Sequence, residues 1–137
     1  MKQILFFSVV LIMAIACSST RNTVKINSVD EDAAAADTVE YELETFDARF
    51  ETWYALHDQP SKYRSEQYYE SWNHKYVNAW NFNATRPGNR FFETIVGYDP
   101  TVDYNFELDH KLFYYFQYVE NELGIQIMPG GPQSIVF

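Results

Sequence analysis

Apolar and polar residues alternate along residues 41–46, which read Tyr-Glu-Leu-Glu-Thr-Phe. A period of two is typical of a strand with one buried face. Asp47 follows and can cap a helix, which Pro60 ends. Within that helix, large side chains fall three or four residues apart, at Phe50, Trp53, Tyr54 and His57. The pattern therefore predicts a strand followed by an amphipathic helix.

The next elements are predicted by the same reasoning. Ser61 can cap a second helix that runs to about Asn83. Residues 92–98 are rich in β-branched side chains and precede an Asp-Pro turn signal, so they predict a second strand. A third helix is predicted up to a C-cap at Gly124. Its apolar stripe consists of Phe106, Leu108, Leu112, Tyr115, Phe116, Val119 and Leu123.

Together these elements predict an α+β domain over residues 41–124, with the order β-α-α-β-α. We expect a two-stranded or slightly larger sheet packed by three helices. Such a small domain is marginal unless its side chains are large. The chain has 11 Phe, 11 Tyr and 3 Trp, which can supply the missing buried area. Residues 125–137, which include two prolines and two glycines, are expected to form an irregular C-terminal tail.

The N-terminus carries one positive charge, at Lys2, and then an apolar run that Ser8 interrupts and Ala16 ends. This run is too short to cross a hydrocarbon core of about 30 Å, and it is typical of a secretory signal. Ala14-Ile15-Ala16-Cys17 follows, and it resembles the lipobox of a bacterial lipoprotein, with Ala14 where Leu is most common. The resemblance implies a signal peptide over residues 1–16, cleaved between Ala16 and Cys17. It also implies that Cys17 receives diacylglycerol.

The cysteine count agrees with this interpretation. Cys17 is the only cysteine, so it cannot form a disulfide within the chain, and a thiol bound to lipid needs no partner. One acyl chain binds a membrane marginally, whereas two or three hold a protein there essentially permanently. An ordinary cleaved signal, or a retained N-terminal anchor, is the alternative. We expect a soluble domain attached to a membrane through N-terminal acyl chains.

Residues 17–40 contain no aromatic side chain and few large apolar ones. Such a segment cannot offset the entropy lost on ordering it. Between Asp30 and Asp58 there are ten acidic residues and one basic residue, Arg49. We therefore expect residues 17–40 to be a flexible acidic tether between the acylated cysteine and the domain.

Charge and motifs limit the possible functions. The chain has 19 acidic and 10 basic residues and a net charge of -9, which argues against nucleic acid as a partner. It contains no nucleophile elbow and no phosphate-binding glycine loop, and lipidation would leave no cysteine for catalysis. The sequence indicates no cofactor and no catalytic residue.

Glu66, Glu70 and His74 recur every four residues and share one helix face, where they could bind a divalent metal or transfer a proton. A solvated helix surface is the simpler interpretation. His110 lies off the apolar stripe and is expected to be exposed. Oxygen-bearing side chains also cluster near a turn, which could suggest calcium, although helix capping explains them equally. They are Asp99, Asp103, Asn105 and Glu107.

Tyr68, Tyr114 and Tyr118 fall off the predicted apolar stripes and could form an exposed binding surface. On a tethered domain such a surface favours an envelope protein as partner. A contact with cell-wall glycan, in which aromatic rings stack on sugars, is the alternative. The sequence thus favours a binding or structural module over a metal-dependent envelope enzyme.

Several aromatic motifs resemble an uncharacterised family of small Bacteroidota lipoproteins, a domain of unknown function. They are Tyr68-Tyr69-Glu70, Trp72-Asn73, Tyr98-Asp99-Pro100, Asp103-Tyr104 and the run 112–116. The family has no established site residues, so the resemblance implies only a Gram-negative envelope. In that phylum acidic residues after the lipidated cysteine resemble a surface-export signal. Residues 18–21 lack them, so we expect the periplasmic face of the outer membrane.

Overall fold

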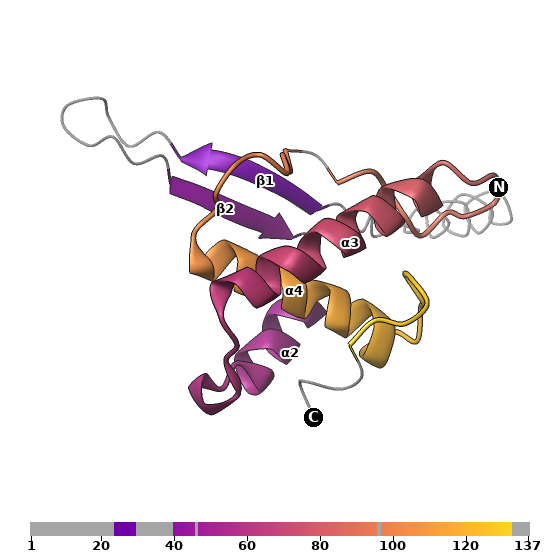
Figure 1. Ribbon diagram of the computed structural model, residues 1–137. Coiled ribbons are helices and arrows are strands. Elements are labelled where there is room, and N and C mark those ends of the chain that lie inside the picture. Colours follow the sequence, from indigo (N-terminus) through magenta and orange to yellow (C-terminus); the bar gives the residue numbers. More distant parts are fainter. Residues whose placement is uncertain (1–23, 30–39, 46, 96, 133–137) are drawn as a thin grey trace, which may run out of the picture.

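The computed structural model describes residues 24–29, 40–45, 47–95 and 97–132 (Figure 1). Two antiparallel strands, β1 (Val24–Val29) and β2 (Glu40–Thr45), form a hairpin. Three α-helices follow, which are α2 (Ala48–His57), α3 (Glu66–Ala84) and α4 (Phe106–Gln117). A 3-10 turn, η2 (Pro60–Lys62), precedes α3, and a π-helical turn, η3 (Tyr118–Glu122), continues α4. None of the helices in these ranges has the length and apolar character needed to span a bilayer.

The α+β class is confirmed, but the predicted order is wrong, because the observed order is β-β-α-α-α. The partner of β2 is β1, which lies inside the range expected to be a tether. In the hairpin Ile26 pairs with Leu43, and both are buried together with Val24. Polar side chains cover the other, exposed face. The tether prediction is therefore wrong for residues 24–29.

The predicted strand over residues 92–98 is also wrong, since the described residues of this range form irregular backbone. The amide of Ile95 donates to Asn81 Oδ1 at 3.0 Å instead of to a neighbouring strand. Gly97 has a φ of 88°, which interrupts extended structure, and it lies against the backbone of Ile26. The segment therefore packs beside β1 as a loop.

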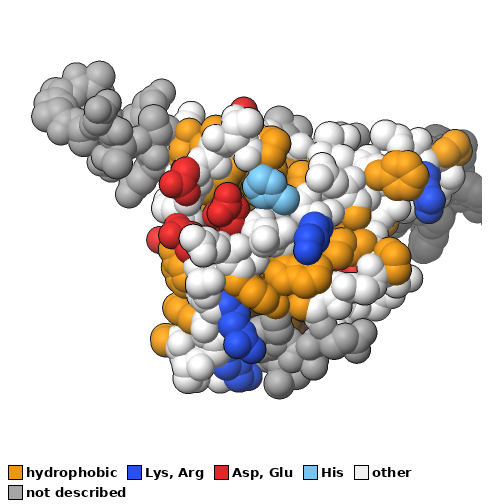
Figure 2. Space-filling model, viewed as in Figure 1, with side chains coloured by type: hydrophobic (Ala, Val, Ile, Leu, Met, Phe, Trp, Pro, Cys, Tyr) orange, Lys and Arg blue, Asp and Glu red, His pale blue; other side chains and the backbone are white. Residues whose placement is uncertain are grey.

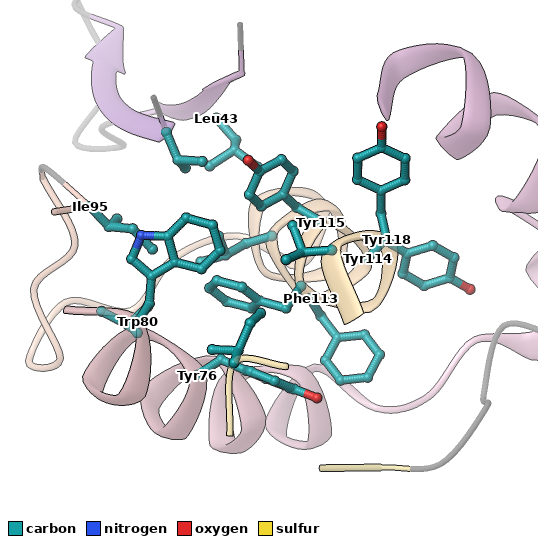
Figure 3. Close-up of a cluster of buried hydrophobic side chains, with 14 of the residues drawn as sticks. Leu43, Tyr76, Trp80, Ile95, Phe113, Tyr114, Tyr115 and Tyr118 are labelled. Carbon is teal, nitrogen blue, oxygen red and sulfur yellow. The ribbon is translucent and has the colours of Figure 1, made fainter. Parts of the chain in front are cut away.

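Helix α4 is the centre of the fold. It contacts α2, α3 and β2, and in Figure 1 it lies between the hairpin and α2, with α3 crossing it. Almost all of its side chains from Leu108 onwards are buried. Figure 3 shows Leu43 of β2 beside Tyr115 of α4, and Ile95 of the loop beside Trp80 of α3. The aromatic residues thus form the core of the domain.

Short polar side chains set the helix starts. Asp47 caps α2 by accepting a hydrogen bond from the Arg49 amide, as predicted. Ser65, and not Ser61, caps α3, because residues 60–62 form η2 first. Asn105 caps α4 through its contact with the Leu108 amide. At the other end Gly124 has a φ of 66°, so it ends the helix as predicted.

Residues 125–132 contain no helix or strand, and side chains hold them against the helices. Glu120 accepts hydrogen bonds from the amides of Ile127 and Met128 and from the hydroxyl of Tyr76. Asn83 donates to the Ile127 carbonyl at 2.8 Å. This end of the described chain therefore packs on both α3 and η3.

Candidate functional site

A hollow of about 100 Å³ opens between α3 and the loop over residues 91–105. On the helix, His74, Asn78 and Asn81 lie four and three residues apart, so they share one face. The loop supplies an aromatic ring and a proline. The complete lining consists of His74, Val77, Asn78, Asn81, Tyr98 and Pro100.

The loop side of the hollow is held by hydrogen bonds around Tyr104. Its hydroxyl accepts from the Asp99 amide at 2.7 Å and donates to the Gly97 carbonyl at 3.0 Å. The ring of Tyr98 stacks on that of Tyr104, with centroids 5.2 Å apart. His74 meets Tyr98 edge to face at 5.6 Å. These contacts hold the Tyr98 ring at the edge of the hollow.

A buried carboxylate lies near this wall. Asn73 of α3 donates to both Oδ1 and the backbone carbonyl of Asp109 at 2.9 Å, and Asp109 is 1% exposed. Burial raises the pKa of Asp109 to about 6, against the opposing effect of the Asn73 hydrogen bond. Burial, reinforced by the charge of Asp109, also raises the pKa of Tyr98. Tyr98 is therefore a neutral hydroxyl at physiological pH.

The side chains of the hollow include both hydrogen-bond donors and hydrogen-bond acceptors. Asn78 is exposed and offers a carboxamide donor and acceptor, and Asn81 keeps its Nδ2 donor while its oxygen binds Ile95. His74 adds a ring nitrogen, which lies 4.0 Å from Glu70. Polar planar groups beside an aromatic ring match a ligand rich in hydroxyls and with flat apolar faces.

The predicted metal ligands are only partly brought together. Glu70 and His74 contact each other across one helical turn, whereas Glu66 is exposed at the start of α3. Across the part of the chain that the structure describes, no three His, Cys, Asp or Glu side chains are grouped to hold a metal ion. Among the calcium candidates, Asn105 caps α4, and Asp99 binds the amide and hydroxyl of Thr101.

His110 is buried, so its predicted exposure is wrong. Its Nδ1 lies 2.9 Å from the Tyr54 hydroxyl, and its Nε2 faces Asp58 Oδ1 at 3.9 Å. Tyr63 donates to the same carboxylate at 2.5 Å. The 3.9 Å between His110 Nε2 and Asp58 Oδ1 is too long for a hydrogen bond. The geometry fits the tautomer in which Tyr54 donates to Nδ1 and the Nε2 proton points toward Asp58.

The group formed by His110, Tyr54, Asp58 and Tyr63 joins the end of α2 to α4. Burial lowers the pKa of His110, while the nearby charge of Asp58 opposes the shift. The hydrogen bond to Asp58 raises the pKa of Tyr63 to about 12. The imidazole stacks on Phe106 and lies 4.3 Å from the ring centre of Tyr114. Its packing among aromatic rings is that of a structural group.

The predicted tyrosine surface is wrong for two of its three members. Tyr114 and Tyr118 are buried, because other elements surround α4 instead of covering one face of it. Tyr68 is half-buried and packs against Trp72 and Phe113. The three tyrosines therefore do not form one exposed patch.

Sequence reasoning missed the carboxamides of the hollow. The available signal was the polar series His74, Asn78 and Asn81, which lies away from the aromatic stripe of the same helix. Its spacing shows a shared face, but only the folded loop shows that Tyr98 meets it. The predicted cleavage and lipidation residues, Ala16 and Cys17, lie outside the described residues.

Neither a curated protein nor a solved structure matches the chain. One protein family, described as a family of unknown function (DUF6146), matches over residues 5–130. The match includes both strands, the three α-helices and every residue that lines the hollow. The chain therefore belongs to this family of unknown function, DUF6146, as its resemblance to a domain of unknown function predicted.

Proposed function

We propose that the protein is a lipid-anchored binding module of a Gram-negative cell envelope, on the periplasmic face of the outer membrane. The signal-like N-terminus and the lipobox-like Ala16-Cys17 pair support the anchor. The fold also limits the distance between the proposed anchor and the domain. Because β1 begins at Val24, only six residues separate the folded domain from Cys17.

The anchor is tested by replacing the sulfur. We expect Cys17→Ser to abolish incorporation of a clickable palmitate analogue and to leave an uncleaved precursor, because the acyl acceptor is gone. Labelling is read on gels and precursor length by intact mass. Ser18→Ala is the matched control and keeps its label. Labelling of the Cys17→Ser protein, or a mature chain that starts at another residue, would contradict the anchor.

The hollow beside α3 carries the binding part of the proposal. Its carboxamides, imidazole and tyrosine suit a hydroxyl-rich ligand, and cell-wall glycan is the envelope component with that chemistry. An envelope protein as partner has less support, since Tyr114 and Tyr118 are buried and cannot contact it. We therefore propose that the hollow binds a sugar unit of the cell wall.

Retention on purified peptidoglycan sacculi tests this ligand. We expect Asn78→Ala combined with His74→Ala to weaken retention about 30-fold, because each lost hydrogen bond changes affinity by about 1 kcal/mol, or about fivefold, and two are removed. The acylated protein is held in detergent, and bound protein is measured after sedimentation.

The control is Gln59→Ala, which removes an exposed carboxamide directly before η2, away from the hollow. It should leave retention unchanged. Circular dichroism verifies that each variant folds. Unchanged retention of the folded double variant would exclude the hollow as the glycan site, while the labelling experiment still decides the anchor.

A further inference from the structure

The C-terminal end of α3 and the turn after it expose apolar and basic side chains together. We define the α3 tip as Phe82, Arg86, Pro87, Arg90 and Phe91. Phe82 is 59% exposed, and the guanidinium carbon of Arg86 lies 4.8 Å from its ring centre. Arg86, Pro87 and Arg90 are exposed, and Phe91 is half-buried. An exposed aromatic ring under an arginine is suited to a boundary between apolar and charged surroundings.

The charge of the α3 tip is opposite to that of the whole chain. Residues 71–92 contain no Asp or Glu, although the chain has 19 of them and a net charge of -9. Neither Arg86 nor Arg90 belongs to an ion pair between described residues. On the face seen in Figure 2, acidic side chains gather at the upper left, and a basic side chain lies beside hydrophobic ones at the right, where α3 ends. Other basic side chains lie in the centre and at the lower left. The α3 tip is therefore a basic region at one end of an acidic molecule.

The α3 tip lies toward the same side as the start of β1 (Figure 1). Seven Cα steps join Cys17 to Val24, so these two residues are at most about 25 Å apart in any conformation. The loop that returns from the α3 tip packs against β1, where Gly97 meets the backbone of Ile26. An anchor at Cys17 would thus hold this side of the domain next to the bilayer.

We propose that the α3 tip contacts the anionic phospholipid headgroups of the membrane that carries the anchor, an inference that rests on the proposed acylation of Cys17. Arg86 and Arg90 bind lipid phosphates, and Phe82 inserts its ring at the boundary between headgroups and acyl chains. Anionic lipids attract basic side chains placed within a Debye length of the surface. The acidic end of the domain then points away from the lipid.

Local structure explains only part of this arrangement. Arg86 directly follows the C-cap Thr85 and is favoured there by the helix dipole and by the ring of Phe82. Neither effect accounts for Arg90, which lies beyond the turn, or for a phenylalanine left 59% exposed. A lipid surface accounts for all three residues.

The test places a fluorescent probe on the α3 tip of the acylated protein. Because Cys17 is blocked by lipid, Asn89→Cys provides a single thiol for the polarity-sensitive label NBD. We expect its emission to increase and shift to the blue in vesicles of phosphatidylethanolamine with phosphatidylglycerol, and less in phosphatidylcholine. Arg86→Glu with Arg90→Glu should shift the contact equilibrium about 25-fold or more toward the free tip, since each basic residue contributes about fivefold.

Two matched controls test whether the response to lipid is specific to the α3 tip. Lys62→Glu with Arg64→Glu makes the same charge change before the other end of α3, about 28 Å away, and should leave the emission unchanged. A label at Gln59→Cys should not respond to lipid. An equal response at positions 59 and 89, or an equal response in the two kinds of vesicle, would overturn the inference. Flotation of the protein with vesicles tests the anchor separately, and failure to float would overturn both proposals.

Discussion

Replacing Gly97 with alanine is expected to lower the free energy of unfolding by about 3 kcal/mol, as measured by urea unfolding of the protein with circular dichroism. Gly97 has a φ of 88°, a conformation that costs an alanine about 1–2 kcal/mol. A Cβ at this position would also overlap the carbonyl oxygen of Ile26. Because that atom belongs to the backbone of β1, the strand must shift away from the loop.

Gly88→Ala separates the two causes. Gly88 has nearly the same φ, 85°, but a Cβ there would meet no other atom within 4 Å. We expect Gly88→Ala to lose only the backbone cost of about 1–2 kcal/mol. Similar losses at positions 88 and 97 would show that the loop does not pack against β1 as described.

The second large effect is expected from Trp80→Ala, which should lower the free energy of unfolding by about 3–5 kcal/mol in the same assay. Trp80 is fully buried, and its Nε1 donates to the Glu93 carbonyl at 2.6 Å. Alanine removes this donor and leaves a cavity in the core. The rings that would line the cavity are Phe91, Phe92, Tyr115 and Phe116.

Trp72→Ala is the matched control on the same helix. Trp72 is half-buried, and the Lys75 ammonium lies over its ring at 4.3 Å. Its removal should cost about 1–2 kcal/mol, because part of its surface is already in water. A loss at Trp72 as large as that at Trp80 would contradict the described position of the core.

The elements that the sequence predicted correctly depend on local signals. Strand β2 shows strict alternation, and Asp47 caps α2 through its own side chain. The helical course of α4 and η3, and the turn with positive φ at Gly124 that follows them, also depend on neighbouring residues. Each signal lies within a few positions of the structure it specifies, so it can be read without knowledge of the fold.

The errors came from interactions between distant residues. Strand β1 has only short alternation, and it forms because β2 and the core behind it cover Val24 and Ile26. The β-branched residues near Ile95 favour a strand, but Asn81 takes the amide that a partner strand would bind. The β-propensity of a residue does not show whether a distant side chain will bind its backbone amide in place of a neighbouring strand.

In the candidate site, too, local spacing could be predicted from the sequence, whereas contacts between distant residues could not. Helical spacing places His74, Asn78 and Asn81 on one face, but Tyr98 reaches them only through the hydrogen bonds of Tyr104. His110 and Tyr114 were expected on a solvated face because a single apolar stripe implies burial on one side. Helix α4 is covered on several sides, so that assumption fails for it.

The position of β1 determines where an anchored form of this protein can act. If Cys17 carries the proposed acyl chains, the six residues between it and the first strand would keep the domain close to the membrane. The distance that such an anchored domain reaches from the lipid would then depend mainly on the size of the domain itself. Its longest helix, α3, has 19 residues and is about 28 Å long. A cell-wall strand would have to approach the bilayer to be bound, and the protein would then fix the spacing between the two layers.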